Sequence, residues 1–457
     1  MYILTIYSDQ YKAKLTTAAG AVSLVKSGDY IEYSNFTAYP YELDKALAKR
    51  KDELSRVFVR VTFLLNEPEI TKADPEGDIF VLMDYSWSKT TRKLHREKKA
   101  IWPLTYLYHE MPMYYSHDVY NCDYVFFAVT PMDKNGYFNC SAANSHILDI
   151  VRAKGGKGKN LKVIAEINPK LPVVPGDNYL HISDVDLIVE AREPVEPVSL
   201  PKIKATEIDE KIADYIMGQM VDGACLQLGI GGMPNLVGKK IAESDLKDLG
   251  CHTEMFVDAY MDLILSGKLT NKKKNVFKER SVFTFGMGSK ELYEFMNGNP
   301  GLYCAPVSYV NDPYIIGLND NVISINSCLC VDIMGNISSE SSGYSQISGT
   351  GGQLDYHYGA FRSKGGKGFL CMPSTKILKN GEEVSTIVTG FPQGTKISVP
   401  SSMVSNVVTE YGIANLMGLS TWEVVEGLLS IAHPKFRSDI EKAAETAGIW
   451  RRSNKIR

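Results

Sequence analysis

The feature that most constrains the fold is a pattern of turns, strands and helices that occurs twice along the chain. The segment 25–50, VKSGDYIEYSNFTAYPYELDKALAKR, is typical of a turn, a strand, a loop with proline and a helix. The segment 220–244, MVDGACLQLGIGGMPNLVGKKIAES, has the same sequence of signals. This repetition predicts that the two halves of the chain have related folds.

A second repeated turn strengthens this prediction. Both halves contain a turn of the form Asp-x-x-Gly, DKNG at 133–136 and DIMG at 332–335. Gly28 precedes Gly136 by 108 residues, and Gly223 precedes Gly335 by 112 residues. Two turns at matched spacing favour an internal duplication over coincidence.

Short β-rich runs alternate with helical segments in both halves and begin at Val57, Tyr124, Leu161, Val322 and Gly368. This alternation predicts an α/β fold: two similar α/β domains from an internal duplication, each with a mainly parallel sheet flanked by helices. Prolines and charges interrupt the pattern in VEAREPVEPVSLPKIKATEID, which starts at residue 189. We therefore expect an N-terminal domain of residues 1–196 and a C-terminal domain of residues 197–457.

The composition excludes several classes of function. The chain has 457 residues, 44% hydrophobic and 23% charged, with a net charge of −3, which gives no electrostatic case for binding nucleic acid or an anionic membrane. The N-terminus is too polar for a signal sequence and no stretch of 18 apolar residues occurs, so we expect a cytoplasmic protein. The eight cysteines and eight histidines form no CxxC or HExxH motif, so no metal is expected.

The first of two glycine turns, LGIGGMPNL at 228–236, has the features of an anion-binding loop. A strand at 225–230 should end at glycines whose missing Cβ atoms let a ligand approach the backbone, and Pro234 suits the first turn of the helix that follows. A plain tight turn between a strand and a helix is the alternative. The dinucleotide fingerprint GxGxxG is excluded, because proline follows Met233.

The second glycine turn, SGTGGQLD at 348–355, is followed by Lys364, Lys367, Lys376 and Lys379. These lysines favour a ligand rich in phosphate, whereas a flexible surface loop with solvated lysines is the alternative. Gly352 is expected to need a positive φ, which an alanine would resist.

A single carboxylate, Glu254, lies between these turns, 25 residues after Gly229 and 98 before Gly352. A carboxylate accompanied by loops with bare backbone N–H groups is suited to attack a thioester. The loops can then hold a phosphate-bearing carrier and a developing oxyanion. The alternative is a solvent-facing carboxylate, with the nearby His252 in a structural role.

The chain resembles the acetyl-CoA hydrolase/transferase group of the class I coenzyme A transferases, nearest to its butyryl-CoA:acetate branch and next to its 4-hydroxybutyrate branch. The resemblance runs nearly from end to end. Its strings are PMDKNGYFN from residue 131, SH at 145, LQLGIGGMPN from 226, AESDLKDLG from 242, HTEMFVDAYMDL from 252, QISGTGGQLD from 346, SKGGK from 363, VTEYGIANLMGLSTWE from 408, IAHPKFR from 431 and WRRSN from 450.

The resemblance implies a role for each candidate residue. Glu254, in the C-terminal domain, would accept coenzyme A as a γ-glutamyl thioester, and Asn311 would polarise the acyl carbonyl. Gly352, with Gly351, would offer a backbone N–H to the thioester oxygen. The residues implied to contact coenzyme A are Gly229, Ile230, Gly231, Gly232, Met233, Leu329, Gly351, Gly352 and Lys379.

The implied reaction transfers coenzyme A between a short-chain acyl-CoA and a free carboxylate, butyryl-CoA and acetate in the first instance, by a ping-pong mechanism. Coenzyme A is then a carrier substrate, no cofactor is bound permanently, and a homodimer is implied. Alternatives are a 4-hydroxybutyrate or other short-chain transferase, an acyl-CoA hydrolase, and a non-catalytic acyl-CoA-binding protein. The segments that start at Tyr85 and Ile101 carry more aromatic residues than expected of the butyryl branch. If they line the acyl pocket, acyl-chain preference is the property expected to differ from that branch.

Overall fold

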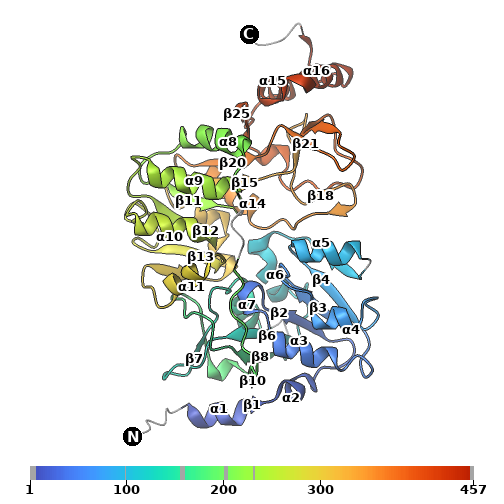
Figure 1. Cartoon of the computed structure of the whole chain (residues 1–457), viewed down its shortest axis with the longest axis vertical. Helices are drawn as coiled ribbons and strands as arrows, with labels where there is room; N and C mark the ends of the chain where they lie inside the picture. The colour runs from blue at the N-terminus through green and yellow to red at the C-terminus, as the bar shows by residue number, and fades with distance from the viewer. Residues whose placement is uncertain (1–6, 98, 155–159, 200–203, 230–231, 453–457) are drawn as a thin grey trace. The chain divides into compact units, whose positions relative to one another are not determined.

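The computed structural model describes residues 7–97, 99–154, 160–199, 204–229 and 232–452. The chain divides into two compact units, and each unit combines segments that are distant in sequence (Figure 1). Unit 1 consists of Met1–Pro201, Glu254–Asp258 and Arg280–Val310; unit 2 consists of Lys202–Thr253, Ala259–Glu279 and Asn311–Arg457. The domain boundary expected between residues 196 and 197 stays a prediction.

Unit 1 contains a sheet of eight strands in the order β1-β10-β8-β6-β2-β3-β4-β5, and its neighbouring strands pair in parallel. Parallel strands need crossover connections, and helices supply several of them. Helices α3, α4 and α5 follow β2, β3 and β4 (Figure 1). The strands are β1 (Leu15–Thr16), β2 (Tyr30–Tyr33), β3 (Val57–Val61), β4 (Phe80–Asp84), β5 (Ile101–Pro103), β6 (Tyr124–Val129), β8 (Lys162–Ile167) and β10 (Leu187–Glu190); the helices are α3 (Tyr41–Ala48), α4 (Glu69–Ala73) and α5 (Lys89–Arg96).

Unit 2 contains strands in the order β12-β11-β15-β20-β24-β25, parallel except for the last pair. The division between the units falls inside β12, between Thr253 and Glu254. In unit 1, β13 (Ser281–Gly286) pairs in parallel with β14 (Leu302–Cys304). The strands of unit 2 are β11 (Cys225–Leu228), β12 (Gly250–Phe256), β15 (Val322–Ser327), β20 (Lys367–Cys371), β24 (Asn406–Thr409) and β25 (Gly412–Asn415), with helices α9 (Gly232–Glu243) and α14 (Gln353–Arg362) in their crossovers.

The predicted duplication is confirmed. The order β3-β2-β6-β8 in the first half corresponds to β12-β11-β15-β20 in the second. The repeated turns also match in detail, because Asp133 Oδ1 accepts the N–H of the second and fourth residues after it at 2.8 and 2.9 Å, and Asp332 Oδ1 does the same at 3.0 and 2.9 Å. Gly136 and Gly335 both adopt the left-handed conformation that these turns require, with φ of 83° and 85°.

Each unit has its own apolar core. In unit 1, Ile31, Leu43, Val59 and Leu82 belong to one buried cluster that joins helix α3 to the sheet. In unit 2, a cluster that includes Leu370, Val407 and Leu428 joins the sheet to helix α15 (Thr421–Ile431). Burial of each such side chain contributes about 1.5–3 kcal/mol. These cores fix the ends of the strands that carry the candidate site.

The remaining helices are α1 (Ser8–Lys14), α2 (Ala18–Val22), α6 (Met111–Ser116), α7 (Ile147–Arg152), α8 (Glu207–Met217), α10 (Asp258–Leu265), α11 (Lys290–Met296), α12 (Val307–Val310), α13 (Pro313–Ile316) and α16 (Arg437–Thr446). The short strands are β7 (Tyr137–Asn139), β9 (Tyr179–His181), β16 (Cys330–Asp332), β17 (Ile337–Ser338), β18 (Ser341–Ser342), β19 (Ser345–Gln346), β21 (Thr375–Ile377), β22 (Glu383–Ser385) and β23 (Ile387–Val388). Among the described residues, no helix combines the length and apolar character needed to cross a membrane.

Candidate functional site

Glu254 lies near the carboxyl end of β12 and is the least buried residue of that strand. The other six residues of Gly250–Phe256 are buried, whereas Glu254 is half-buried. An acidic side chain at a strand end, within an otherwise buried strand, is uncommon unless it has partners or a function. His252, two residues earlier, is buried, and its ring centroid is 6.4 Å from that of Tyr356 in α14.

In unit 1, the negative charge of Glu254 affects the pKa of Tyr108. Burial and, second to it, the negative charge of Glu254 raise the pKa of the Tyr108 phenol well above its ordinary value. Tyr108 is therefore neutral, and its hydroxyl is hydrogen-bonded to the Ser145 hydroxyl. The backbone of Ser145 is held against β13 in turn, since its N–H donates to the Thr284 carbonyl at 3.1 Å.

A buried chain of hydrogen bonds continues from Ser145 into the sheet of unit 1. The distance between Ser145 Oγ and His146 Nδ1 is 3.0 Å, and that between His146 Nε2 and Glu32 Oε1 is also 3.0 Å. The Tyr115 hydroxyl donates to Glu32 Oε2 at 2.5 Å. Although Ser145, His146 and Glu32 form a serine–histidine–carboxylate series, all three are fully buried and the serine hydroxyl is occupied, so the arrangement fixes structure.

Sequence reasoning did not assign roles to Glu32, Tyr108 or Tyr115. Two signals pointed towards this cluster, the dipeptide at 145–146 among the family strings and the aromatic segment that starts at Ile101. The rings of Tyr85 and Tyr106 stack with centroids 4.1 Å apart, and Tyr108 lies 5.3 Å from Tyr85. The two aromatic segments, which start at Tyr85 and Ile101, therefore pack together.

The first glycine loop connects β11 to α9, as predicted. Strand β11 ends at Leu228 and α9 begins at Gly232, so Pro234 falls in the first helical turn. The Gly229 N–H donates to the Ile325 carbonyl at 3.1 Å, and Met233 is buried. Ile230 and Gly231 lie outside the described residues. The free N–H groups at the start of a 12-residue helix favour an anionic ligand.

The second glycine loop leads into α14, with Gly352 as the residue before the helix. The expectation of a positive φ at Gly352 is wrong, because its φ is −90°. The left-handed residue is Gly351, with a φ of +55°. The left-handed residue therefore lies one position earlier than expected. Gly352 has a backbone conformation that residues with a Cβ atom also adopt. No side chain caps α14 at Gly352, which favours an anionic ligand at this helix end.

Within unit 2, strand β15 brings the two glycine loops together. Gly229 donates its N–H to Ile325 of β15, and Gln353, the first residue of α14, donates its side-chain amide to the Ser327 carbonyl at 2.7 Å. Since β11 and β15 are parallel neighbours, both loops lie at the carboxyl ends of adjacent strands. Ligands of open α/β sheets bind at this end of the strands.

The remaining candidates, Asn311, Leu329 and Lys379, differ in their surroundings. Asn311 is fully buried, and its amide donates to Asp355 in the first turn of α14 at 3.4 Å, so it belongs with the second loop. Leu329 follows β15, and its N–H donates to the Ser338 carbonyl at 2.9 Å. Lys379 lies on the exposed turn between β21 and β22.

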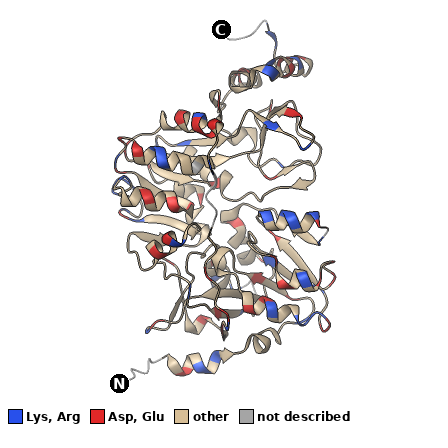
Figure 2. Cartoon of the chain, in the orientation of Figure 1, with Lys and Arg blue, Asp and Glu red and all other residues tan. Residues whose placement is uncertain are grey.

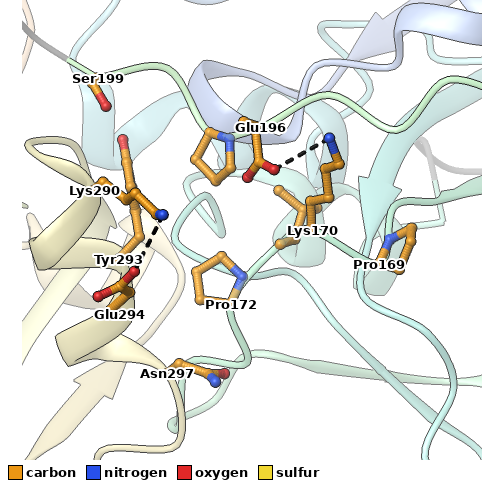
Figure 3. A pocket seen from close by; sticks show the side chains of 11 residues that line it. Pro169, Lys170, Pro172, Glu196, Ser199, Lys290, Tyr293, Glu294 and Asn297 are labelled. Carbon is orange, nitrogen blue, oxygen red and sulfur yellow. Dashed lines mark ion pairs between the residues drawn. The ribbon is translucent and has the colours of Figure 1, made fainter.

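A cavity beside α11 and the basic helix α5 are two further surface features of unit 1, and neither has a defined ligand. A cavity of about 480 Å³ lies beside α11, and its lysines are paired, Lys170 with Glu196 at 3.2 Å and Lys290 with Glu294 at 3.6 Å (Figure 3). Helix α5 is rich in lysine and arginine, which are blue in Figure 2. Within the described ranges, no group of three or more His, Cys, Asp or Glu side chains is arranged to hold a metal ion.

Comparison with known proteins identifies the family. The profile of the acetyl-CoA hydrolase/transferase N-terminal domain matches residues 5–199, and that of the C-terminal domain matches residues 288–444. A butyryl-CoA:acetate CoA-transferase of Anaerostipes caccae is 43% identical, over 98% of this chain and 100% of that protein. The chain belongs to the acetyl-CoA hydrolase/transferase family. The predicted family and the prediction of an enzyme are thus confirmed.

Two further proteins are similar to this chain over nearly its whole length. A 4-hydroxybutyrate coenzyme A transferase of Clostridium kluyveri is 35% identical, over 95% of this chain and 98% of that protein. The crystal structure of RipA from Yersinia pestis is 34% identical, with a TM-score of 0.85, over 96% of this chain and 99% of that one. The predicted fold class is confirmed by this likeness.

Proposed function

We propose that this enzyme transfers coenzyme A between a short-chain acyl-CoA and a free carboxylate, with butyryl-CoA and acetate as the first pair to test. The observation that carries the proposal is the 43% identity, over 98% of this chain and 100% of the other, to a butyryl-CoA:acetate CoA-transferase. The relatives named for butyrate and for 4-hydroxybutyrate support a short acyl chain.

The chemistry follows from a carboxylate nucleophile. An oxygen of Glu254 attacks the acyl carbonyl carbon, the carbon–sulfur bond breaks, and an acyl-glutamyl anhydride and coenzyme A thiolate result. The thiolate then attacks the glutamyl carbonyl carbon of the anhydride, which forms the γ-glutamyl thioester and releases the first carboxylate. An incoming carboxylate reverses both steps and leaves as the new acyl-CoA. The thioester bond energy is kept throughout.

The two glycine loops have separate roles in this proposal. The start of α9 holds the phosphate-bearing part of coenzyme A, since a helix N-terminus and free N–H groups attract anions. The backbone N–H groups at Gly351 and Gly352 stabilise the oxyanion that develops on the thioester carbonyl. In this proposal Asn311 polarises the acyl carbonyl, and its hydrogen bond to Asp355 beside the second loop supports that role.

The test separates transfer from hydrolysis. Butyryl-CoA is incubated with labelled acetate, and labelled acetyl-CoA is measured by chromatography; without acetate, free thiol is measured instead. Transfer gives acetyl-CoA in proportion to acetate and little free thiol. Rapid thiol release that is independent of acetate would favour hydrolysis. Mass spectrometry after incubation with butyryl-CoA alone should find coenzyme A on the peptide that contains Glu254, and an adduct on a cysteine would contradict the mechanism.

A further inference from the structure

The second glycine loop is closed at its base by one buried acidic residue, Glu340. Its main-chain carbonyl accepts the N–H groups of Ile347 at 2.7 Å and Ser348 at 3.0 Å. One oxygen of its carboxylate accepts the Thr350 hydroxyl at 3.2 Å, and the other accepts the Ser398 hydroxyl at 2.9 Å. The side chain is only 3% exposed. Glu340 thus holds the loop at three residues before Gly351, namely Ile347, Ser348 and Thr350.

Neighbouring side chains hold the far end of the same loop. The Ser339 hydroxyl donates to Gln353 Oε1 at 2.6 Å, and the Gln353 amide donates to the Ser327 carbonyl at 2.7 Å. The Ser339 N–H donates to Ser398 Oγ at 2.9 Å, which links this end to Glu340 through a shared serine. Gly351 and Gly352 therefore lie between two fixed points, Thr350 and Gln353.

A buried carboxylate such as that of Glu340 needs partners that offset the loss of water. Removing a charged group from water costs several kcal/mol unless hydrogen bonds or an opposite charge offset it. Glu340 has two hydroxyl donors, and its negative charge interacts with the positive charge of Lys396. The carboxylate thus ties Thr350 and Ser398 to one buried group, at 3.2 and 2.9 Å.

We propose that Glu340 is a positioning residue for the reaction: by holding Thr350 and the base of the loop, it sets the direction in which the backbone N–H groups of Gly351 and Gly352 point. The inference rests on the proposed function, in which these N–H groups stabilise the oxyanion. Oxyanion donors must lie within about 2.7–3.1 Å of the charged oxygen, so a small rotation of the loop is enough to weaken them.

The test compares Glu340→Ala with Glu340→Gln. Alanine removes both acceptors, so kcat for acetate-dependent transfer should fall by roughly 10- to 100-fold, while KM for butyryl-CoA changes much less. Glutamine keeps one oxygen able to accept the Thr350 hydroxyl and should restore a large part of kcat. Thr350→Val removes only that hydroxyl and should lower kcat without unfolding the protein, which keeps the proposal testable if Glu340→Ala does not fold.

Asp332→Ala is the matched control. Asp332 is also a nearly buried carboxylate of unit 2, but it organises the turn between β16 and β17 by accepting the N–H groups of Met334 and Asn336 at 3.0 and 2.9 Å. Its loss should lower the melting temperature and leave kcat near the wild-type value. An equal fall in kcat for Asp332→Ala and Glu340→Ala would overturn the proposal, because general destabilisation would then suffice.

Glu254→Gln, measured in parallel, separates this inference from the function on which it rests. If Glu254→Gln is inactive while folded Glu340→Ala and Thr350→Val both keep wild-type kcat, the positioning role is wrong and the proposed function survives. If Glu254→Gln keeps its turnover, the proposed function itself fails. Inactive Glu254→Gln, together with low kcat and little-changed KM in Glu340→Ala and recovery in Glu340→Gln, supports both.

Discussion

Replacing Gly351 tests whether the left-handed turn before α14 sets the rate of the reaction. Gly351 has a φ of +55°, and this conformation costs a residue with a Cβ atom about 1–2 kcal/mol. Gly352, with a φ of −90°, adopts a conformation that alanine tolerates. Strain is therefore expected from Gly351→Ala and not from Gly352→Ala.

The size of the effect follows from that strain. If the loop relieves the strain by leaving its native conformation, 1–2 kcal/mol makes the competent conformation about 5- to 30-fold less populated. We expect kcat of Gly351→Ala to fall by about that factor. Affinity for coenzyme A, measured by calorimetry, should change less, because the first glycine loop holds the carrier in our proposal.

Gly351→Asn is the control that separates strain from bulk. Asparagine is larger than alanine but adopts the left-handed conformation more readily. Turnover should therefore decrease in the order Gly351, Gly351→Asn, Gly351→Ala, with butyryl-CoA and acetate as substrates and circular dichroism to verify folding. A lower rate for Gly351→Asn than for Gly351→Ala would refute the argument from backbone strain and indicate a steric effect.

Three further predictions concern the nucleophile, the buried network and a buried histidine. Glu254→Gln and Glu254→Asp should each lower turnover by roughly 100-fold or more, with coenzyme A affinity unchanged. Near-normal turnover of Glu254→Gln would show that Glu254 is not the nucleophile. Glu32→Ala leaves two buried donors without their acceptor and should lower the free energy of unfolding in urea by about 3 kcal/mol. Glu193→Ala, which removes an exposed ion pair, should lower the free energy of unfolding by less than about 1 kcal/mol. Equal losses for Glu32→Ala and Glu193→Ala would contradict a stabilising role of the buried network around Glu32. Burial lowers the pKa of His357 to about 4 from 6.5. Between pH 6.5 and 4 the unfolded chain therefore binds a proton at His357 that the native state does not bind. The free energy of unfolding should fall by up to about 3 kcal/mol as pH drops from 6.5 to 4. His357→Gln should remove that part of the acid loss, and identical pH profiles for the two proteins would show that His357 does not titrate in this way.

The local elements were predictable because they depend on neighbouring residues. The strands that begin near Val57, Tyr124, Leu161, Val322 and Gly368 occur as β3, β6, β8, β15 and β20, since β-rich runs between turn signals have few other stable conformations. The duplication was visible for a related reason, because a turn such as Asp-x-x-Gly needs the same residues wherever it occurs.

Contacts between distant segments were not predictable from local pattern. The sequence indicated that the second loop needs a left-handed glycine but pointed to Gly352, whereas the folded loop uses Gly351, because that choice depends on where Thr350 and Gln353 are held. Glu340 could not be distinguished from other acidic residues, since its partner Ser398 lies 58 residues away.

The sequence by itself determined the duplicated α/β architecture, the family and the candidate nucleophile, because periodicity, turn residues and long motifs are properties of contiguous segments. Only the tertiary structure decided that the charge of Glu254 acts on Tyr108 in unit 1, and which residues hold the second glycine loop in unit 2. The network from Glu32 through His146 and Ser145 to Tyr108 joins three separate parts of the first unit. Such a network exists only when burial makes unpaired polar groups costly, and burial is a property of the folded chain.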